Sequence, residues 1–396
     1  MSGGSGVGAS GVGASVGREA RTTLVRAARM VDVARTVEDG WVLVDGDTIR
    51  ATGSGRDAPD ADELVDLGAA TLVPGFVDLH GHGGATEAYE DASFTDALAM
   101  HRAHGTTRSV LSLVANPVPT LVASLSRVRS VMATDPLVLG VHLEGPFLSP
   151  DNKGAHNADF LVAPTPDVVD ELLAAGEGVL RQVTIAPELP GALDAVRRFV
   201  AAGVTVAVGH TVGTYEQARA ALDSGATVLT HAFNAMPGLH HRAPGPIGAA
   251  VADDRVTLEL ILDGVHVHPA AARTLLRAAP GRVALITDAM GAAGAADGAY
   301  RLGSLDVTVT DGVAHVAGTD TIAGSTLTQD VALRNAVELV GLSLPEAVAA
   351  LTSVPARALG LGDRLGRIAS GYAADLVALS PSLEVQRVWG GGQPLA

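Results

Sequence analysis

Residues 137–147 read LVLGVHLEGPF, and this stretch decides what kind of fold the chain can have. Its apolar part is typical of a buried strand, yet the run ends in Glu144, just before the turn residues Gly145 and Pro146. An ionised carboxylate is almost never fully buried unless something pairs with it. The stretch therefore predicts a buried strand that ends where Glu144 meets a positive partner.

The stretch is one of eight apolar, strand-like runs. By number they are 71–80, 106–114, 137–145, 180–188, 204–210, 226–233, 257–266 and 282–289. Segments with helical periodicity, such as 94–105, 192–203 and 214–225, alternate with them. Eight strand–helix repeats over roughly 250 residues indicate an α/β fold, a (β/α)8 TIM-like barrel. A doubly wound open sheet is the alternative, but no GxGxxG motif follows the first run.

Both ends of the chain have a different, β-like pattern. WVLVDGDTIRA (41–51) carries a hairpin turn at Asp45–Asp47, and residues 366–392 are again β-like. We expect the two ends to build one small β-sandwich domain beside the barrel. We expect a flexible Gly/Ser-rich tail at residues 1–20 and the barrel at residues 72–352. The small domain is expected to consist of an N-terminal part, residues 21–71, and a C-terminal part, residues 353–396.

Three further elements are expected between the last barrel strand and the C-terminal β segment. Residues 300–318 predict a hairpin, and helices are expected over 326–341 and 344–360. The second helix opens with a capping box made by Ser343 and Glu346.

Composition excludes several classes of protein. The chain has 396 residues, a net charge of −16 and no cysteine, so disulfides, Cys–metal sites and thiol nucleophiles are excluded. The negative charge argues against nucleic acid and anionic membranes as partners. No apolar run is long enough to span a membrane, and the N-terminus lacks the apolar region of a signal peptide, so a cytoplasmic protein is expected.

Lysine is nearly absent. Of 27 basic residues only Lys153 is a lysine, and no GxxxxGK[ST] motif surrounds it. A mechanism that needs a Schiff base, a P-loop lysine or a carboxylated lysine therefore has one candidate residue.

Imidazole and carboxylate side chains gather at the ends of the predicted strands. Catalytic groups of barrel enzymes come from the C-terminal ends of the strands. The residues at those ends are His80, His82, Glu144, His210, His231, Asp263, His266 and Asp288. Such donors suit zinc, iron, manganese or a similar divalent ion. We expect His80 and His82 to hold one ion, His210 and His231 another, and Glu144 to bridge them.

Other polar residues carry a weaker signal. Glu188 ends the fourth run and is a weaker ligand candidate. His142 shares a strand face with Glu144, as a support for the site or as plain packing. His101 and His104 form an HxxH within a helical stretch, and we expect them to face solvent.

The order of the strand-end groups resembles the amidohydrolase superfamily. HxH after the first strand, single His residues after the fifth and sixth and Asp after the eighth follow that pattern. Many binuclear members bridge their metals with a carboxylated lysine, and no lysine stands at a strand end here. The resemblance therefore disfavours hydantoinase-like, dihydroorotase-like and phosphotriesterase-like activities.

A narrower set of motifs resembles N-acetylglucosamine-6-phosphate deacetylases. HLEGPFLSPDNKGAHN, VGHT, THAFNAMPGLHHRAPG, DGVHV, LITDAM and TIAGSTLT occur in that family's order between residues 142 and 328. Some members replace HxH and use a single metal, whereas His80 and His82 are present here. The resemblance implies a hydrolase with one or two divalent ions per subunit, with Zn²⁺ expected first and Fe²⁺, Mn²⁺ or Co²⁺ as alternatives.

The resemblance also assigns roles to residues. It implies that Glu144, His210 and His231 hold the main metal and that Asp288 is the general base and acid. The substrate contacts it implies are Ala155, His156, Asn234, Ala235, Arg242, His266, Ile322, Ala323 and Gly324. Arg242 would bind the phosphate, in some members across a subunit boundary, which implies a homodimer.

Three functions stay open from the sequence. The first is deacetylation of N-acetylglucosamine 6-phosphate in amino-sugar breakdown or cell-wall recycling. The second is the same chemistry on a related N-acyl amine, such as N-acetylgalactosamine 6-phosphate or an N-acyl amino acid. The third is a non-catalytic interaction protein, which would be expected to lack some ligands.

Overall fold

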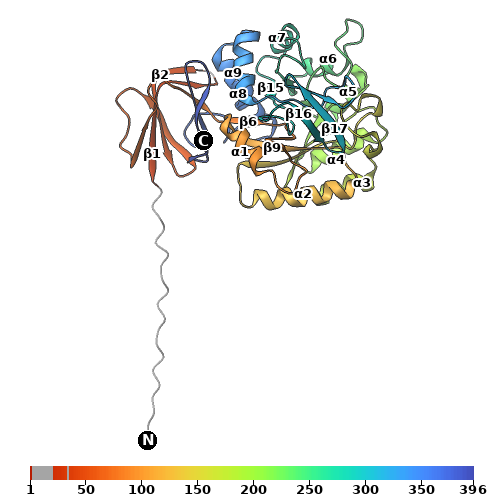
Figure 1. The fold of residues 1–396 in the computed structure, drawn as a ribbon, viewed down its shortest axis with the longest axis horizontal. Helices are drawn as coiled ribbons and strands as arrows, with labels where there is room; N and C mark the ends of the chain where they lie inside the picture. The colour runs from red at the N-terminus through yellow and green to blue at the C-terminus, as the bar shows by residue number, and fades with distance from the viewer. Residues whose placement is uncertain (2–20, 34) are drawn as a thin grey trace.

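The structure, a computed structural model, describes Met1, residues 21–33 and residues 35–396. The predicted tail, apart from Met1, lies outside the described residues. Figure 1 shows a small β domain on one side and a larger α/β body on the other, and the C-terminus ends within the small domain.

The larger body is a parallel barrel, as predicted. Its eight strands form one sheet in the order β15-β14-β13-β12-β11-β10-β9-β6. Their bounds are β6 (Phe76–Asp78), β9 (Thr106–Val114), β10 (Val138–Glu144), β11 (Leu180–Ile185), β12 (Thr205–Val208), β13 (Val228–Leu229), β14 (Thr257–Ile261) and β15 (Val283–Ile286). Each of the eight apolar runs therefore supplies one strand of the barrel.

Side chains close the barrel between its first and last strands. The Gln329 amide donates to the carbonyl of Val77 on β6 at 3.2 Å and to that of Leu285 on β15 at 3.4 Å. The Thr287 hydroxyl donates to Asp78 at 2.6 Å. These bonds span the gap between β15 and β6.

Helices cover the outside of the barrel. They are α1 (Thr95–Ala103), α2 (Val118–Met132), α3 (Pro166–Gly176), α4 (Ala192–Ala201), α5 (Tyr215–Asp223), α6 (Gly245–Val251), α7 (Pro269–Ala278), α8 (Gln329–Asn335), α9 (Leu344–Leu351) and α10 (Ser353–Ala358). A π-helical turn, Ala336–Val340, extends α8, and two short 3-10 turns, Pro150–Asn152 and Ala158–Phe160, follow β10. α4 is an example of how these helices pack on the barrel. Its buried residues lie at helical spacing and form one apolar stripe: Ala192, Ala195, Val196 and Phe199.

One helix prediction was too long. Residues 344–360 form two helices, α9 and α10, with the break at Thr352. Pro355 has no N–H to bond back to residue 351 and its ring disfavours a continuous helix, which explains the break. The capping box of Ser343 and Glu346 at the start of α9 is confirmed.

The chain ends form the small domain together. Its strands are β1 (Thr22–Asp32), β2 (Arg35–Asp45), β3 (Thr48–Ser54), β4 (Glu63–Asp66), β5 (Thr71–Pro74), β19 (Leu376–Leu379), β20 (Val385–Gly390) and β21 (Gln393–Pro394). β5 joins the two halves of this sheet, pairing with β1 in parallel and with β19 antiparallel. Val25, Val42, Ile49, Leu72 and Leu376 are part of its buried core.

The first predicted run is divided between the two sheets. β5 belongs to the small domain and β6 to the barrel, with Gly75 between them. A Cβ at Gly75 would overlap Thr107 and Asp375, so only glycine lets the chain cross here. Treating residues 71–80 as one barrel strand was wrong for its first half, because an apolar run does not show which sheet buries it. The domain boundaries themselves stay a prediction.

Smaller hairpins complete the mouth of the barrel. β16 (Gly298–Leu302), β17 (Leu305–Thr310) and β18 (Val313–Val316) form the predicted hairpin as an antiparallel three-stranded sheet. β7 (Gly83–Gly84) and β8 (Glu87–Ala88) form a two-residue ladder after the first barrel strand. No described helix is long and apolar enough to cross a membrane.

Candidate active site

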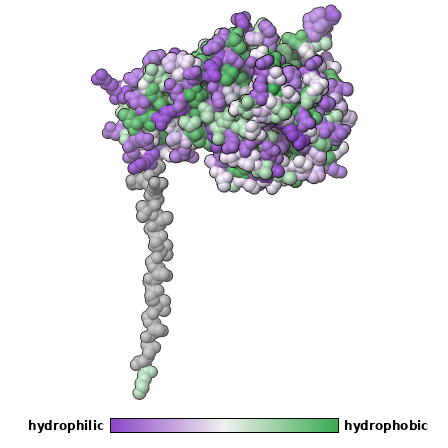
Figure 2. All heavy atoms as spheres, in the orientation of Figure 1, coloured by the Kyte–Doolittle hydropathy of each residue, from purple (hydrophilic) through white to green (hydrophobic). Residues whose placement is uncertain are grey.

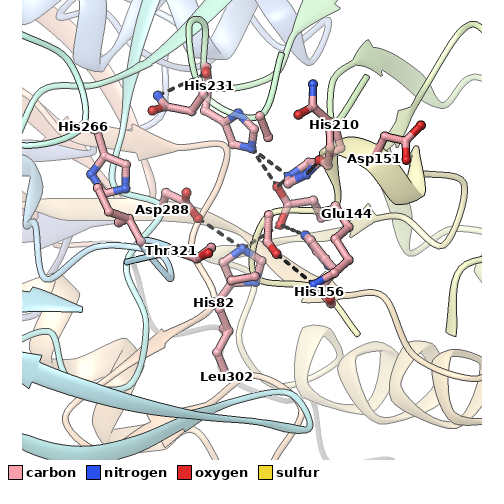
Figure 3. Close-up of a pocket in the computed structure, with 18 of the residues that line it drawn as sticks. His82, Glu144, Asp151, His156, His210, His231, His266, Asp288, Leu302 and Thr321 are labelled. Carbon is pink, nitrogen blue, oxygen red and sulfur yellow. Dashed lines mark hydrogen bonds and ion pairs between the residues drawn. The ribbon is translucent and has the colours of Figure 1, made fainter. Parts of the chain in front are cut away.

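The predicted ligands meet at the C-terminal end of the barrel. His80 and His82 follow β6, Glu144 ends β10, His210 and His231 follow β12 and β13, and Asp288 follows β15. Figure 3 shows His82 and Asp288 on one side of Glu144 and His210 and His231 on the other. All six side chains are buried, with 8 % or less of each residue exposed. Parallel strands of a barrel deliver their last residues to one rim, and this explains the convergence.

The backbone at three of these residues is strained. His210, His231 and Asp288 have φ of 45°, 25° and 47°, in the left-handed region that residues with a Cβ rarely adopt. Such conformations cost about 1–3 kcal/mol each and persist where the surrounding structure imposes them. Their clustering at the strand ends indicates that the fold holds these side chains in place for a function.

Glu144 lies at the centre of the site. Its Oε1 lies 3.0 Å from His210 Nε2, 3.1 Å from His231 Nε2 and 3.3 Å from His80 Nε2. Its Oε2 lies 3.1 Å from His82 Nε2. The carboxylate thus faces both histidine pairs, as the predicted bridging role requires.

Two groups of ligand atoms are close enough to surround an ion. Glu144, His210 and His231 form one, and His80, His82 and Asp288 form the other, each with its atoms within 4.8 Å. Asp288 Oδ1 is 3.2 Å from His82 Nε2 and 3.5 Å from His80 Nε2. Atoms bound tetrahedrally at 2.0–2.1 Å from one ion lie about 3.3 Å from one another. The observed spacings match that value.

Hydrogen bonds behind two rings aim their free lone pairs at Glu144. The Nδ1–H of His210 donates to the Asn152 carbonyl at 3.0 Å, and that of His80 donates to Glu259 at 3.1 Å. In the neutral form of each ring Nε2 is then the unprotonated nitrogen, and it faces a carboxylate oxygen. Two lone pairs repel unless a cation lies between them, so this donor set fits a divalent ion.

The pKa shifts show the same demand for positive charge. Burial disfavours the charged form of His82, but Asp288 and Glu144 outweigh it and raise its pKa to about 9. Burial also works against an ionised Glu144, yet His80 and His156 hold the pKa of this carboxyl well below its usual range. Burial lowers the pKa of His210 to about 4. A divalent ion satisfies both carboxylates without a proton on any ring.

Glu259 is a buried carboxylate beside the ligand groups that the sequence analysis missed. It is fully buried on β14, where it accepts from His80 Nδ1 and from Gln182 Nε2 at 2.8 Å. A carboxylate behind a metal-binding histidine fixes its tautomer and raises its basicity. The available signal was a glutamate in the middle of the apolar strand TLELI, Thr257–Ile261.

His156 reaches the same centre from the loop after β10. Its Nδ1 accepts from the backbone N–H of Ala115 at 3.1 Å, so in the neutral ring the proton is on Nε2. Nε2 lies 3.3 Å from Glu144 Oε2 and faces the cavity, as Figure 3 shows. His156 is therefore a hydrogen-bond donor beside the ligand groups.

A cavity of about 530 Å³ opens onto the site. Its walls contain most of the predicted contacts: His82, Glu144, Ala155, His156, His210, His231, Asn234, Ala235, His266, Asp288, Ile322 and Gly324. Lys153, Asp151 and Asp320 line it as well. His80 lies below the floor and is fully buried.

His266 is held at the rim by Asp263. The two bond through Nδ1 and Oδ2 at 2.6 Å, and Asp263 also accepts the backbone N–H of His266 at 2.8 Å. Burial lowers the pKa of His266, but the Asp263 carboxylate raises it more, for a net increase. Asp263 thus fixes the orientation of the His266 ring where it lines the cavity.

Two predicted substrate contacts do not line this cavity. Arg242 lies in the loop before α6, and its guanidinium contacts the neighbouring His241 at 2.9 Å. That loop projects beside α6 in Figure 1, and Figure 2 shows hydrophilic atoms at its tip. Ala323 is fully buried, with its N–H bonded to the Ala314 carbonyl. Only the flanking residues Ile322 and Gly324 reach the cavity.

The weaker candidates have structural partners. Glu188 accepts from the Thr211 hydroxyl and from the N–H of Val212 at 2.7 Å, and it is not part of either ligand group. His142 lies beneath His80, with a ring centroid distance of 4.6 Å. It bonds to Ser112 and Thr184 at 3.0 and 2.8 Å, so it supports the site from below.

The expectation that His101 and His104 face solvent was wrong for His101. His101 is buried, donates from Nε2 to the Gly83 carbonyl at 2.9 Å, and burial lowers its pKa to about 4. His104 is partly exposed and bonds to Asp330 at 3.0 Å. The helical stripe of α1 that packs inward includes His101, which the HxxH pattern alone did not show.

Fold and site together define a metal-dependent hydrolase. The chain belongs to the amidohydrolase family, whose model matches residues 71–395. That match spans the whole barrel and the C-terminal strands of the small domain.

The chain is similar to sugar-phosphate deacetylases along nearly its whole length. It superposes on a mutant N-acetyl-D-glucosamine-6-phosphate deacetylase from Mycobacterium smegmatis, in complex with N-acetyl-D-glucosamine-6-phosphate, with a TM-score of 0.90 and 45 % identity, over 95 % of this chain and 100 % of that one. It is 40 % identical to an N-acetylgalactosamine-6-phosphate deacetylase of Escherichia coli O157:H7 over 94 % of this chain and 99 % of that protein. It is 38 % identical to an N-acetylglucosamine-6-phosphate deacetylase of Bos taurus over 84 % of this chain and 85 % of that protein.

Proposed function

We propose that the chain hydrolyses the acetamide of N-acetyl-D-glucosamine 6-phosphate to D-glucosamine 6-phosphate and acetate. The observation that carries the proposal is the meeting of Glu144, His210 and His231 with Asp288 in one cavity. The similarity to deacetylases of 6-phosphorylated amino sugars supports the substrate class. Because every ligand is present, a non-catalytic role is not supported.

Amide hydrolysis needs a nucleophilic water, a polarised carbonyl and a proton for the leaving amine. Glu144, His210 and His231 would hold a divalent ion, which would lower the pKa of a bound water and act as a Lewis acid. Asp288 is ionised, since His80 and His82 outweigh burial and hold its pKa below the usual range. Asp288 therefore takes a proton from the attacking water and delivers it to the amine nitrogen as the C–N bond breaks.

His156 is the donor for the carbonyl oxygen. Its proton is on Nε2, which faces the cavity beside Glu144. A hydrogen bond from Nε2 to the acetyl oxygen strengthens as negative charge develops there, and this lowers the barrier.

The sugar-phosphate end is assigned to the other side of the cavity. His266, whose pKa the Asp263 carboxylate raises, and the polar groups of Asn234 and Ala235 line this region. The loop that carries Arg242 projects from the barrel, so Arg242 would contribute to the cavity of a second copy. A homodimer with Arg242 acting across the interface accounts for this placement.

Ion identity and number are part of the proposal. Imidazole and carboxylate ligands suit Zn²⁺, with Fe²⁺, Mn²⁺ or Co²⁺ as alternatives. The second group, His80, His82 and Asp288, provides for a second ion beside the first. Metal analysis of the purified protein would distinguish one ion per chain from two.

A phosphorylated sugar carries almost two negative charges and does not cross a bilayer unaided. The enzyme must work in the compartment where that sugar is formed or imported. We therefore place it in the cytoplasm, in the breakdown of amino sugars or the recycling of cell-wall sugars.

Acetate release tests the function directly. Wild-type enzyme should release acetate from N-acetylglucosamine 6-phosphate far faster than from unphosphorylated N-acetylglucosamine. Asp288→Asn should lose on the order of 10²–10⁴-fold in kcat while still binding substrate, because the proton acceptor is gone. No release from either compound would refute the proposed activity, and an unaffected variant would refute the role of Asp288.

Subunit mixing tests the dimer. Asp288→Asn and Arg242→Ala chains should each be weakly active alone. In a mixed dimer the Arg242→Ala chain keeps its Asp288 and receives Arg242 from its neighbour, so mixing should restore activity. Unchanged activity after subunit exchange would show that Arg242 does not act across an interface.

N-acetylgalactosamine 6-phosphate is the second candidate substrate. It is favoured by the 40 % identity to a deacetylase of that sugar phosphate. The two sugars differ only at C4, so the comparison of their kcat/KM values decides between them. Equal values would indicate a cavity that makes no productive contact with the C4 hydroxyl.

A further inference from the structure

Lys153 lies in the substrate cavity but has no role in the proposed mechanism. It is the only lysine of the chain and lies in the loop between β10 and α3. Its half-buried side chain lines the substrate cavity. Nζ donates to the carbonyls of His156 at 3.1 Å and Gly154 at 3.4 Å.

The ammonium of Lys153 has no carboxylate partner among the described residues. Its hydrogen bonds go to two neutral carbonyls, and an ammonium has three N–H donors. A partly desolvated charge without a counter-ion is unfavourable. This arrangement becomes favourable when an anion enters the cavity.

The other charges around the cavity strengthen this requirement. Four carboxylates line it: Glu144 and Asp288 in the ligand groups, and Asp151 and Asp320 on the walls. Lys153 is the only lysine or arginine among the described residues that line the cavity. An anionic substrate entering past Asp151 and Asp320 therefore meets Lys153 as a cation on the cavity wall.

Lys153 is also next to the segment assigned to the phosphate. Gly154, the next residue, packs against His210 and Ala235. A Cβ added at Gly154 would lie 3.1 Å from Cε1 of His210 and 3.9 Å from the Cβ of Ala235. The loop of Lys153 thus abuts the Asn234–Ala235 turn on the cavity wall.

We propose that Lys153 binds the phosphate of the substrate within its own subunit and makes the enzyme select phosphorylated over unphosphorylated sugars. The inference rests on the proposed function, and it adds a cationic contact that does not depend on a second copy. Arg242 and Lys153 would then approach the phosphate from two different chains.

A purely structural role is the competing explanation, because Nζ holds the carbonyl of His156. Three variants separate the two. Lys153→Met removes both charge and donors, Lys153→Gln removes the charge but keeps N–H donors, and Lys153→Arg keeps the charge. For each, kcat/KM is measured on N-acetylglucosamine 6-phosphate and on N-acetylglucosamine, with metal content and melting temperature as checks of folding.

The phosphate contact predicts that the ratio of the two kcat/KM values falls about 10- to 100-fold in both neutral variants and stays within about 3-fold in Lys153→Arg. The loss should appear mainly in KM, and inhibition by inorganic phosphate should weaken in parallel. A normal ratio in Lys153→Gln, or an equal loss on both sugars in every variant, would overturn the inference. Wild-type enzyme inactive on both sugars would instead refute the proposed function, so the two failures are distinguishable.

Discussion

Two buried clusters of charge in this molecule are built in opposite ways. At the junction of barrel and small domain, Arg108 on β9 donates to both oxygens of Asp375, at 2.7 and 3.0 Å. Asp375 also accepts the N–H of Gly391 at 2.7 Å, so this pair is complete within the chain. At the barrel mouth, the Glu144 carboxylate faces Nε2 of four histidines, whose lone pairs repel its own unless a cation lies between them.

The difference shows how a structural cluster is told from a functional one. A buried ion pair with matched donors and acceptors needs nothing more from outside. A cluster whose acceptors face one another is stable only with an added cation. The strained backbone at His210, His231 and Asp288 occurs at the incomplete cluster. The predictions below test this contrast.

The largest effect is expected at Glu144. Glu144→Gln should lose on the order of 10³-fold or more in kcat/KM, because the amide cannot supply the charge that holds the ion. Metal content should fall with it. The matched control is Glu188→Gln, which changes a carboxylate whose bonds within the described residues go to Thr211 and Val212, and which should keep its metal. Full metal content in Glu144→Gln would contradict the assignment.

At the junction of barrel and small domain, a mutation should change the stability of the fold and leave the metal site intact. Asp375→Ala leaves the largely buried Arg108 guanidinium without its carboxylate partner and should lower the free energy of unfolding by about 3 kcal/mol. Metal content and kcat of the folded fraction should stay close to the wild-type values. Denaturant titration beside metal analysis would check both. A loss of metal at unchanged stability would remove the distinction between the clusters.

His101 predicts a dependence of stability on pH. Its pKa is about 4 in the folded chain against 6.5 for an ordinary histidine, so the unfolded chain binds a proton more readily. Stability should therefore fall as the pH drops from about 6.5 towards 4, by up to ~3 kcal/mol from this residue.

His101→Gln, which can still donate to Gly83, should lose that part of the pH dependence. Unfolding by urea at about pH 7 and about pH 5 compares the two proteins, with an expected difference of ~2 kcal/mol at the lower pH. Parallel stability curves would show that His101 is not held neutral.

The smallest effect is expected at Glu259. Glu259→Gln weakens the hydrogen bond that orients His80, so the ion held by His80 and His82 should bind about 10- to 100-fold more weakly. The ion at Glu144, His210 and His231 should be nearly unaffected. Metal titration that resolves two classes of sites measures this. Equal weakening of both classes would mean that the two groups act as one site.

Local pattern was enough to predict most of the architecture. Eight apolar runs separated by helical periodicity predicted the barrel, and the polar residues at their ends predicted where the ligands meet. These features depend on neighbours in sequence and on one rule, that parallel strands bring their C-terminal ends to one rim. The sequence also contains only one lysine, and none at a strand end. This was the reason for assigning the bridging role to Glu144.

The rest depended on contacts between distant residues. Which sheet buries residues 71–74, which face of α1 turns His101 inward, and which way the Arg242 loop points are decided by packing, not by the local pattern. The same holds for the site. Glu259 is 179 positions from His80, and Ala115 is 41 positions from the His156 ring whose proton it places. The sequence names the donor atoms, but only the tertiary structure sets which nitrogen carries a proton, because that proton follows the hydrogen-bond partner that folding brings beside the ring.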